Sequence, residues 1–520
     1  MDLLIWYAGT AVLFLCIIVP QSLLTVNGQR SSLNGQVDST PCGHRGPELT
    51  VSETANECSR SRGHAISSTT EINRRHSRYY LKILAQANDL YVEGGEALER
   101  GLNLFDLEWP NIQVGQERAS RRNADDDEAA LLSNQYPGYG SLLLRIRQHP
   151  RDQIRWCETA LAAAQRLKDR LAEAVHLGNL GVAYYLLGEY KHSIECHQQN
   201  LTIAQEIKNR HSEGVASGNL GLAYASLGEY RRAIEFYEKH LNVSREVSDR
   251  QGEGIALGNL GTAHNSMGEY RRAIEFYEQN LAIAREISDR QGEGAALGNL
   301  GIAYTFLGEH TRTIDFQEQG LAIMRETGNR QGEAQALGNL GDSYYCLQKP
   351  LRAIECHQQN LIIAREVGDR YGEGAALGNL GLGYASIGEY RHAIEFQEQR
   401  LSIAQEIGDY QGIGQALGNL GSAWRSLGEY GRAINYHQQD LVIARQIGDR
   451  NGEGEALGNL GNVYFTLGEY TRAIEFYEQV LDIARSIGNR QVEASTLQRL
   501  SLSRCLSGDG EALLRIVASI

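Results

Sequence analysis

Apolar residues recur at helical spacing through most of the chain, in a unit that repeats every 40 residues from Leu171 onward. In the first half of each unit, the apolar residues lie on one side of a predicted helix. In a representative copy this stripe consists of Ala296, Leu297, Leu300 and Tyr304. Leu307 and Gly308 follow, and a glycine at this point can adopt the left-handed conformation that ends a helix. Each unit is therefore expected to begin with an amphipathic helix that stops at a glycine.

The second half of the unit repeats the same design. Its apolar positions in the same copy are Ile314, Phe316, Leu321 and Ile323, and Gly328-Asn329 forms the next turn. The tetrapeptide GNLG occurs eight times without insertion or deletion, at positions 178, 218, 258, 298, 338, 378, 418 and 458. Because one helix pair leaves apolar surface uncovered, the pairs must stack on each other. The pattern predicts an all-α solenoid of antiparallel helix pairs over residues 140–506, with eight full repeats from residue 171 and partial repeats at both ends.

The repeats resemble the tetratricopeptide repeat (TPR) family. The resemblance is carried by the run LGNLGTAHNSMGEYRRAIEFYEQNLAIAREISDR from Leu257, in which the family's packing positions hold Leu260, Gly261, Ala263, Gly268, Tyr270, Ala273 and Phe276. It implies a right-handed superhelix with a concave groove. The 40-residue length is similar to that of Pins-type G-protein-signalling modulators. Residues 78–115 and the run RQHPRDQIRW from Arg147 resemble the linker of bacterial NB-ARC–TPR (STAND) proteins.

An asparagine occupies the same position in the first helix of all eight full repeats, although asparagine is a mediocre helix former. Its amide offers one donor and one acceptor, which is what a peptide bond requires. In TPR arrays such as kinesin light chain, the equivalent asparagines bind the backbone of an extended peptide. The resemblance implies the same role for the asparagines of this chain. Contacts between neighbouring repeats are the alternative role. The predicted peptide-binding residues are Asn179, Asn219, Asn259, Asn299, Asn339, Asn379, Asn419 and Asn459.

The residues near these asparagines vary, so ligand specificity is expected there. Val182, Tyr185 and Leu222 make the N-terminal part of the groove apolar, whereas Asp342 and Arg425 make the later part polar. All five are candidate peptide-binding residues.

A second pattern crosses the turns between units, where an arginine precedes a glutamate by three residues. The pairs are Arg170/Glu173, Arg210/Glu213, Arg250/Glu253, Arg290/Glu293, Arg330/Glu333, Arg370/Glu373, Arg450/Glu453 and Arg490/Glu493. In the single exception both members change, to Tyr410 and Ile413. Joint replacement indicates that the two side chains touch and play a structural role.

The flanks of the array divide into four segments. Residues 1–27 contain an uncharged apolar stretch, residues 3–24, which fits a signal peptide, a retained anchor or a reading frame extended beyond a soluble protein. We expect either a cytoplasmic array with membrane contact through this stretch, or a secreted one. Residues 28–75 are expected to be a disordered linker and residues 76–139 a helical flanking region, with helices closing at Trp109-Pro110 and a turn at 136–138. Residues 507–520 form a C-terminal tail.

The composition and the absence of catalytic motifs argue against several classes of function. A formal net charge of -14 argues against a nucleic-acid partner, because such proteins concentrate lysine and arginine. No GxxxxGK(S/T), GxSxG or HExxH motif occurs, so we expect no enzymatic activity, cofactor or metal. His197, His357 and His437 share one second-helix position, and we interpret them as packing residues.

These observations favour a non-catalytic scaffold that binds a protein or an extended peptide in the groove. The alternative is the sensor or autoinhibitory part of a STAND-type signalling ATPase that lacks its nucleotide-binding domain.

Overall fold

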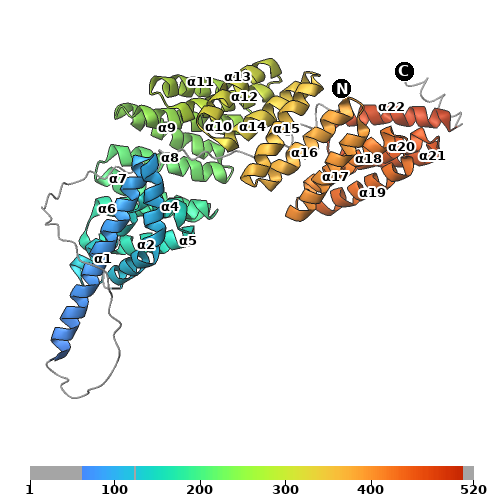
Figure 1. Cartoon of the computed structure of the whole chain (residues 1–520). Coiled ribbons are helices and arrows are strands. Elements are labelled where there is room, and N and C mark those ends of the chain that lie inside the picture. The colour runs from blue at the N-terminus through green and yellow to red at the C-terminus, as the bar shows by residue number, and fades with distance from the viewer. Residues whose placement is uncertain (1–60, 122–123, 508–520) are drawn as a thin grey trace, which may run out of the picture. The chain divides into compact units, whose positions relative to one another are not determined.

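The computed structural model describes residues 61–121 and 124–507, which form 22 helices and no strand (Figure 1). Contacts between Cα atoms divide the chain at residue 269 into an N-terminal and a C-terminal unit. We describe residues 61–269 as the N-terminal unit and residues 270–507 as the C-terminal unit. The expected segment 1–27 and residues 28–60 of the expected linker lie outside the described residues, as do residues 508–520.

Five helices precede the repeats in the N-terminal unit: α1 (Ser61–Glu93), α2 (Glu96–Ser120), α3 (Asp127–Tyr139), α4 (Ser141–Arg147) and α5 (Pro150–Leu167). Their core contains Leu84, Phe105, Ile112, Tyr136 and Trp156. Gly115 allows the close approach of α2 to α3, since a Cβ there would lie 2.3 Å from the Tyr136 hydroxyl.

Three expectations about this region were wrong. Helix α1 begins at Ser61, inside the range expected to be a disordered linker. Helix α2 continues through Pro110 to Ser120, because Phe105 and Ile112 on either side of the proline are both buried. Residues 136–138 belong to α3, where burial of Tyr136 and Pro137 outweighs the turn propensity of proline and glycine.

The repeats begin at α6, and the first helix of each pair has an even number. In the N-terminal unit they are α6 (Arg170–Leu186), α7 (Tyr190–Glu206), α8 (Arg210–Ser226), α9 (Tyr230–Glu246) and α10 (Arg250–Ser266). In the C-terminal unit they are α11 (Tyr270–Glu286), α12 (Arg290–Phe306), α13 (His310–Glu326), α14 (Arg330–Cys346), α15 (Pro350–Val367), α16 (Arg370–Ser386), α17 (Tyr390–Ile407), α18 (Tyr410–Ser426), α19 (Tyr430–Ile447), α20 (Arg450–Thr466), α21 (Tyr470–Ser486) and α22 (Arg490–Leu506). The prediction of an all-α array of stacked helix pairs is confirmed.

Local signals set the ends of these helices. An aspartate or asparagine caps each first helix: Asp289, for example, accepts a hydrogen bond from the backbone N–H of Gly292 at 2.9 Å. Gly308 follows the first helix with a φ of 75°, as its predicted stop function requires. Such caps fix the length of each helix, so successive pairs stack in the same register.

The two helices of a pair approach closely at the second glycine of GNLG. A Cβ at Gly301 would lie 2.4 Å from Nε2 of Gln317, and one at Gly341 would lie 2.4 Å from Cε1 of His357. Glycine therefore makes room for a large buried side chain from the second helix.

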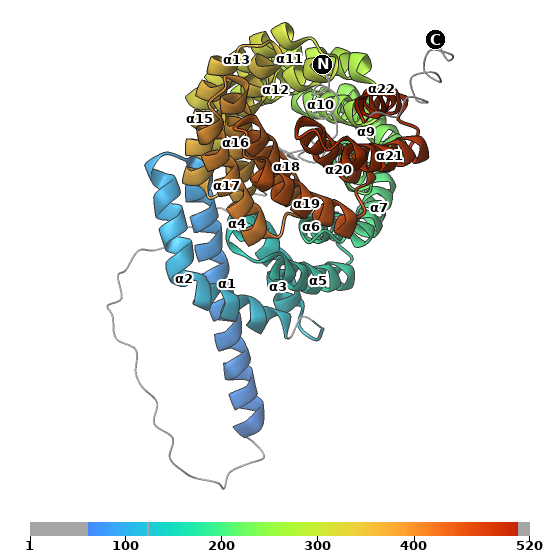
Figure 2. The same ribbon diagram turned by 90° about the vertical axis from the view of Figure 1, so that its right-hand side faces the viewer.

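First helices and second helices take different sides of the stack. Within each unit, neighbouring first helices contact each other more closely than neighbouring second helices do. In the C-terminal unit, the first helices lie along the inner side of the curve (Figure 2). The surface of the first helices is therefore the concave side of each unit.

Candidate peptide-binding face

We define the first-helix face as the eight predicted asparagines together with the residues three and six positions after each of them. Asn219 is buried, and the other seven asparagines are partly exposed. Asn179, Asn219 and Asn259 belong to the N-terminal unit, and the remaining five belong to the C-terminal unit. Each asparagine stands in the middle of its helix, so the amides of consecutive repeats form a row within each unit.

Neighbouring repeats meet along this row. Asn379 donates a hydrogen bond from Nδ2 to Oδ1 of Asp342, on the preceding first helix, at 3.0 Å. Arg499 occupies the asparagine position of the last first helix, and it donates to Oδ1 of Asn462 at 2.5 Å. Asn379 therefore contacts the neighbouring repeat, which is the alternative role that the sequence left open for the asparagines. A ligand role for the others stays a prediction.

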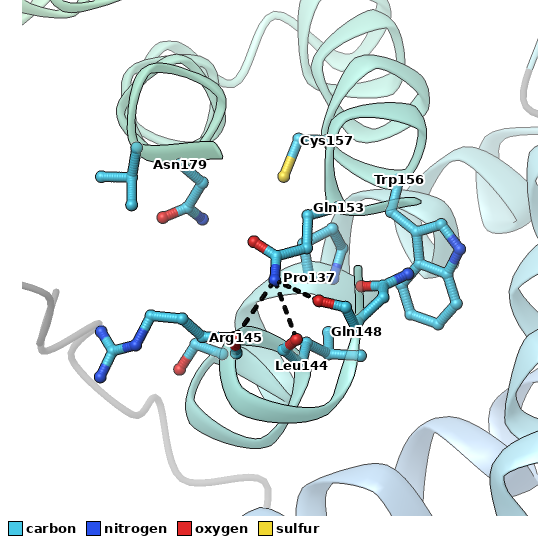
Figure 3. Close-up of a pocket in the computed structure, with 10 residues that line it drawn as sticks. Pro137, Leu144, Arg145, Gln148, Gln153, Trp156, Cys157 and Asn179 are labelled. Atoms are coloured by element: carbon cyan, nitrogen blue, oxygen red, sulfur yellow. Dashed lines mark hydrogen bonds between the residues drawn. The ribbon is translucent and has the colours of Figure 1, made fainter. Parts of the chain in front are cut away.

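The apolar part of the face is in the N-terminal unit. Val182, Tyr185 and Leu222 are all partly buried, and the Tyr185 hydroxyl lies 3.0 Å from Oγ of Ser226 in the next repeat. Asn179 and Val182 also line a pocket of about 50 Å³, together with Pro137, Ser141, Leu144, Arg145, Gln148, Gln153, Trp156 and Cys157 (Figure 3). Gln153, which lines this pocket, donates to three backbone carbonyls, among them that of Gln148 at 2.9 Å. This volume holds one or two waters or a single functional group, not a drug-sized ligand.

The polar part of the face is in the C-terminal unit. Burial raises the pKa of Asp342 to about 7, and Nε2 of His357 lies 3.6 Å from its Oδ1. Arg425 is partly buried on α18.

Two further acidic residues, Asp440 on α19 and Glu455 on α20, lie beside this face, and sequence reasoning missed them. Glu455 lies four residues, about one helical turn, before Asn459. The available signal was that each is the single carboxylate at its position among the eight repeats.

Seven of the eight predicted arginine–glutamate pairs are ion pairs in the structure. Distances of 2.5 Å join Arg170 to Glu173, Arg290 to Glu293, Arg330 to Glu333 and Arg370 to Glu373, and the pairs at 210/213, 250/253 and 450/453 also form. Sequence reasoning missed a second arginine, eight residues before the glutamate. It approaches the same carboxylate at 2.8 Å, as Arg285 does at Glu293 and Arg485 does at Glu493. Each such glutamate therefore joins two consecutive repeats.

The second-helix histidines are packing residues, as predicted. His197, His357 and His437 are each at most 2% exposed, and burial lowers the pKa of each to about 4, so they are neutral at physiological pH. Over residues 61–121 and 124–507, no three His, Cys, Asp or Glu side chains are arranged to hold a metal ion.

The membrane expectation is not tested by the structure. The stretch 3–24 lies outside the described residues. Among the helices that are described, none is both long and apolar enough to cross a bilayer.

Stacked antiparallel helix pairs with one repeated packing pattern define a helical-repeat protein. The tetratricopeptide repeat model matches residues 177–246, 252–326, 332–406 and 412–486, which is more than half of the chain. The chain therefore belongs to the tetratricopeptide repeat family. No curated protein matches the chain significantly.

Several solved structures are similar to this chain at low sequence identity. A Signal Transduction ATPase with Numerous Domains (STAND) protein with a tetratricopeptide repeat sensor, from Pyrococcus horikoshii, is 13% identical with a TM-score of 0.56, covering 86% of this chain and 68% of that one. BtubC (BKLC) from P. vanneervenii is 20% identical with a TM-score of 0.39, covering 42% and 92%. The apo form of the quorum sensor NprR from B. thuringiensis is 13% identical with a TM-score of 0.48, covering 65% and 98%. The likeness to the Pyrococcus protein supports the fold alone.

Proposed function

We propose that this protein is a non-catalytic scaffold that binds an extended peptide, or an extended segment of a protein, along its first-helix face. The observation that carries the proposal is the row of asparagine amides on the concave side of each unit. Three of these residues, Asn299, Asn339 and Asn419, occupy equivalent positions on α12, α14 and α18 and are partly exposed. An amide in the middle of a helix adds little to helix stability, so a row of them requires another explanation.

Amide side chains suit this ligand because each can donate to a peptide carbonyl and accept from a peptide N–H. An extended ligand also fits a repeated surface, since a peptide backbone repeats its own donors and acceptors along its length. Side chains beside the asparagines then select the ligand. Val182 and Leu222 favour apolar ligand residues in the N-terminal unit, whereas Asp342 and Arg425 favour polar or charged ones in the C-terminal unit.

The test starts with a random octapeptide library applied to the immobilised full-length protein. Retained peptides are sequenced, resynthesised and mapped by hydrogen exchange. The proposal predicts slower exchange in the first helices, such as α12 and α14, with little change in the exposed turns of the second helices. Protection confined to second helices, or no retained peptide, would contradict it.

A second candidate function is the sensor part of a STAND-type ATPase, because the repeats of the Pyrococcus protein are described as a sensor. On this interpretation the array binds a separate nucleotide-binding chain. Mixing the protein with the isolated nucleotide-binding domain of such an ATPase, followed by gel filtration, tests it. A complex that retained peptides displace would favour the sensor function, and independent elution of the two proteins would count against it.

A further inference from the structure

Two carboxylates, from Asp440 on α19 and Glu455 on α20, occupy a pair of positions whose side chains meet in the preceding repeat. The equivalent residues there are Arg400 and Gln415, and the guanidinium of Arg400 donates a hydrogen bond to Oε1 of Gln415. Because the repeats align without insertion or deletion, Asp440 and Glu455 occupy the equivalent positions one repeat later. Two acids thus replace a pair that is hydrogen-bonded one repeat earlier.

Asp440 is enclosed by the first helix of its own repeat. A Cβ at Gly418 would lie 3.0 Å from its Oδ2, and one at Gly414 would lie 3.3 Å from its Oδ1. The residue is 9% exposed, yet among residues 61–121 and 124–507 no side chain or backbone group donates a hydrogen bond to its carboxylate. A largely buried carboxylate that has only solvent to donate hydrogen bonds to it is destabilising, so this arrangement is not explained by stability.

The surrounding charges increase that cost. Another acid, Asp449, also acts on Asp440, and it caps α20 by accepting a hydrogen bond from the N–H of Gly452 at 3.0 Å. Burial, and then Asp449, raise the pKa of Asp440 to about 7. The charges of Asp440 and Asp449 also act on the carboxylate of Glu455 and disfavour its ionised form. Like charges held together in this way create a site that favours a cation.

The position of the pair connects it with the proposed ligand. Glu455 is exposed and lies one turn before Asn459, and Gly418 directly precedes Asn419, so the pair lies between two of the predicted peptide-binding amides. A peptide whose backbone bonds these asparagines would place one of its side chains over the carboxylates. No third ligand joins the two acids in a metal-binding arrangement within the described part of the chain.

We propose that Asp440 and Glu455 form a subsite of the first-helix face that receives the cationic end of a lysine or arginine side chain of the bound peptide. This inference rests on the proposed function and adds the chemistry of one ligand residue to it. The cation supplies the hydrogen-bond donors that Asp440 lacks and neutralises the repulsion between the two acids.

The experiment uses the full-length chain and the random octapeptide library. Retained peptides should be enriched in lysine or arginine at one position. The best of them is resynthesised with norleucine in place of that lysine, or citrulline in place of that arginine, and each form is titrated calorimetrically. The charged peptide should bind the Asp440→Asn/Glu455→Gln variant about tenfold more weakly than it binds the wild type. The uncharged peptide should bind both proteins equally.

Two controls show whether an affinity loss comes from the charges of this site, from any lost surface charge, or from loss of folding. Glu475→Gln removes an exposed charge on α21 and should leave both affinities unchanged. If the double variant does not fold, as judged by circular dichroism, the single change Glu455→Gln at the exposed member gives the same comparison. Retained peptides without a basic residue, or equal loss of charged and uncharged peptides, would overturn the subsite while the scaffold function stands. A wild type that retains no peptide would overturn both.

Discussion

The bridge at Glu293 gives the sharpest stability prediction. Its carboxylate accepts from Arg285 of the preceding repeat at 2.8 Å and from Arg290 of its own helix at 2.5 Å, and the residue is 8% exposed. The hydrogen bond from Arg285, opposed by burial and assisted by Arg290, lowers the pKa of Glu293 below its ordinary value. Replacement by glutamine keeps the shape but removes the charge, so both guanidinium groups lose a charged acceptor.

The expected loss follows from the exposure of the partners. Hydrogen bonds to charged groups contribute about 1.5–3 kcal/mol when buried, but both arginines are about half exposed, so solvent screening reduces each to about 0.5–1 kcal/mol. Glu293→Gln should therefore lower the free energy of unfolding by about 1–2 kcal/mol. Because the folded-state pKa is lowered, this contribution is present above the ordinary pKa of 4.5 and disappears as the pH falls through the folded-state value.

The assay is urea unfolding of wild type, Glu293→Gln and a control, Glu395→Gln, which removes an exposed charge on α17. Hydrogen exchange in α11 and α12 reports whether the loss is local. The repeat with Tyr410 and Ile413 in place of the arginine–glutamate pair suggests a second comparison, because both residues are apolar and Ile413 is buried. The double change Arg290→Tyr/Glu293→Ile should cost less than Glu293→Ile alone. Equal stability of Glu293→Gln and the control, or additive costs in the second arm, would refute the reasoning.

Three further predictions address packing, titration and modularity. Gly341→Ala should destabilise the protein by about 1–3 kcal/mol in urea unfolding, because the new Cβ would meet His357, whereas Gly431→Ala on α19, which has open space, should be neutral or stabilising by up to about 1 kcal/mol. Asp440→Asn should stabilise the fold above pH 7. The pKa of Asp440 is raised in the folded state, so the wild type has its full stability below the unfolded value of 3.8 and loses part of it as the pH rises through about 7. Thermal melts of wild type and variant at pH 5 and pH 8 measure the difference. Deleting one whole 40-residue unit should leave a cooperative helical melt by circular dichroism, whereas deleting half a unit should not.

The sequence predicted the repeat architecture because its signals are local and are restated in every copy. Gly308 ends a helix by its own backbone freedom, and Gly301 marks a close approach that each repeat contains. Residues 76–139, before the repeats, contain no repeated signal of this kind. There, Pro110 and the residues 136–138 were interpreted by local propensity, and burial of their neighbours against α1 and α5 decided otherwise.

The candidate site was predictable only in part. The asparagine row is visible as a column in the repeats, but the bond from Asn379 to Asp342 depends on which residue the preceding repeat presents. The second arginine of each bridge lies eight residues from its glutamate and across a turn, so no helical spacing rule connects them. Asp440 and Glu455 become neighbours only when the second helix of one repeat packs against the first helix of the next.

The proposed function requires the asparagine amides to bind a peptide backbone. Its most direct test is the triple variant Asn299→Ala/Asn339→Ala/Asn419→Ala, titrated with a peptide retained by the wild type and melted beside it, with Asn435→Ala on α19 as the control. The melting temperature of the triple variant should be unchanged or slightly higher, because alanine is the better helix former. Its affinity for the peptide should be lower by about 0.5–1.5 kcal/mol per lost hydrogen bond. A triple variant that melts much lower than the wild type, while its folded fraction binds the peptide normally, would contradict the claim.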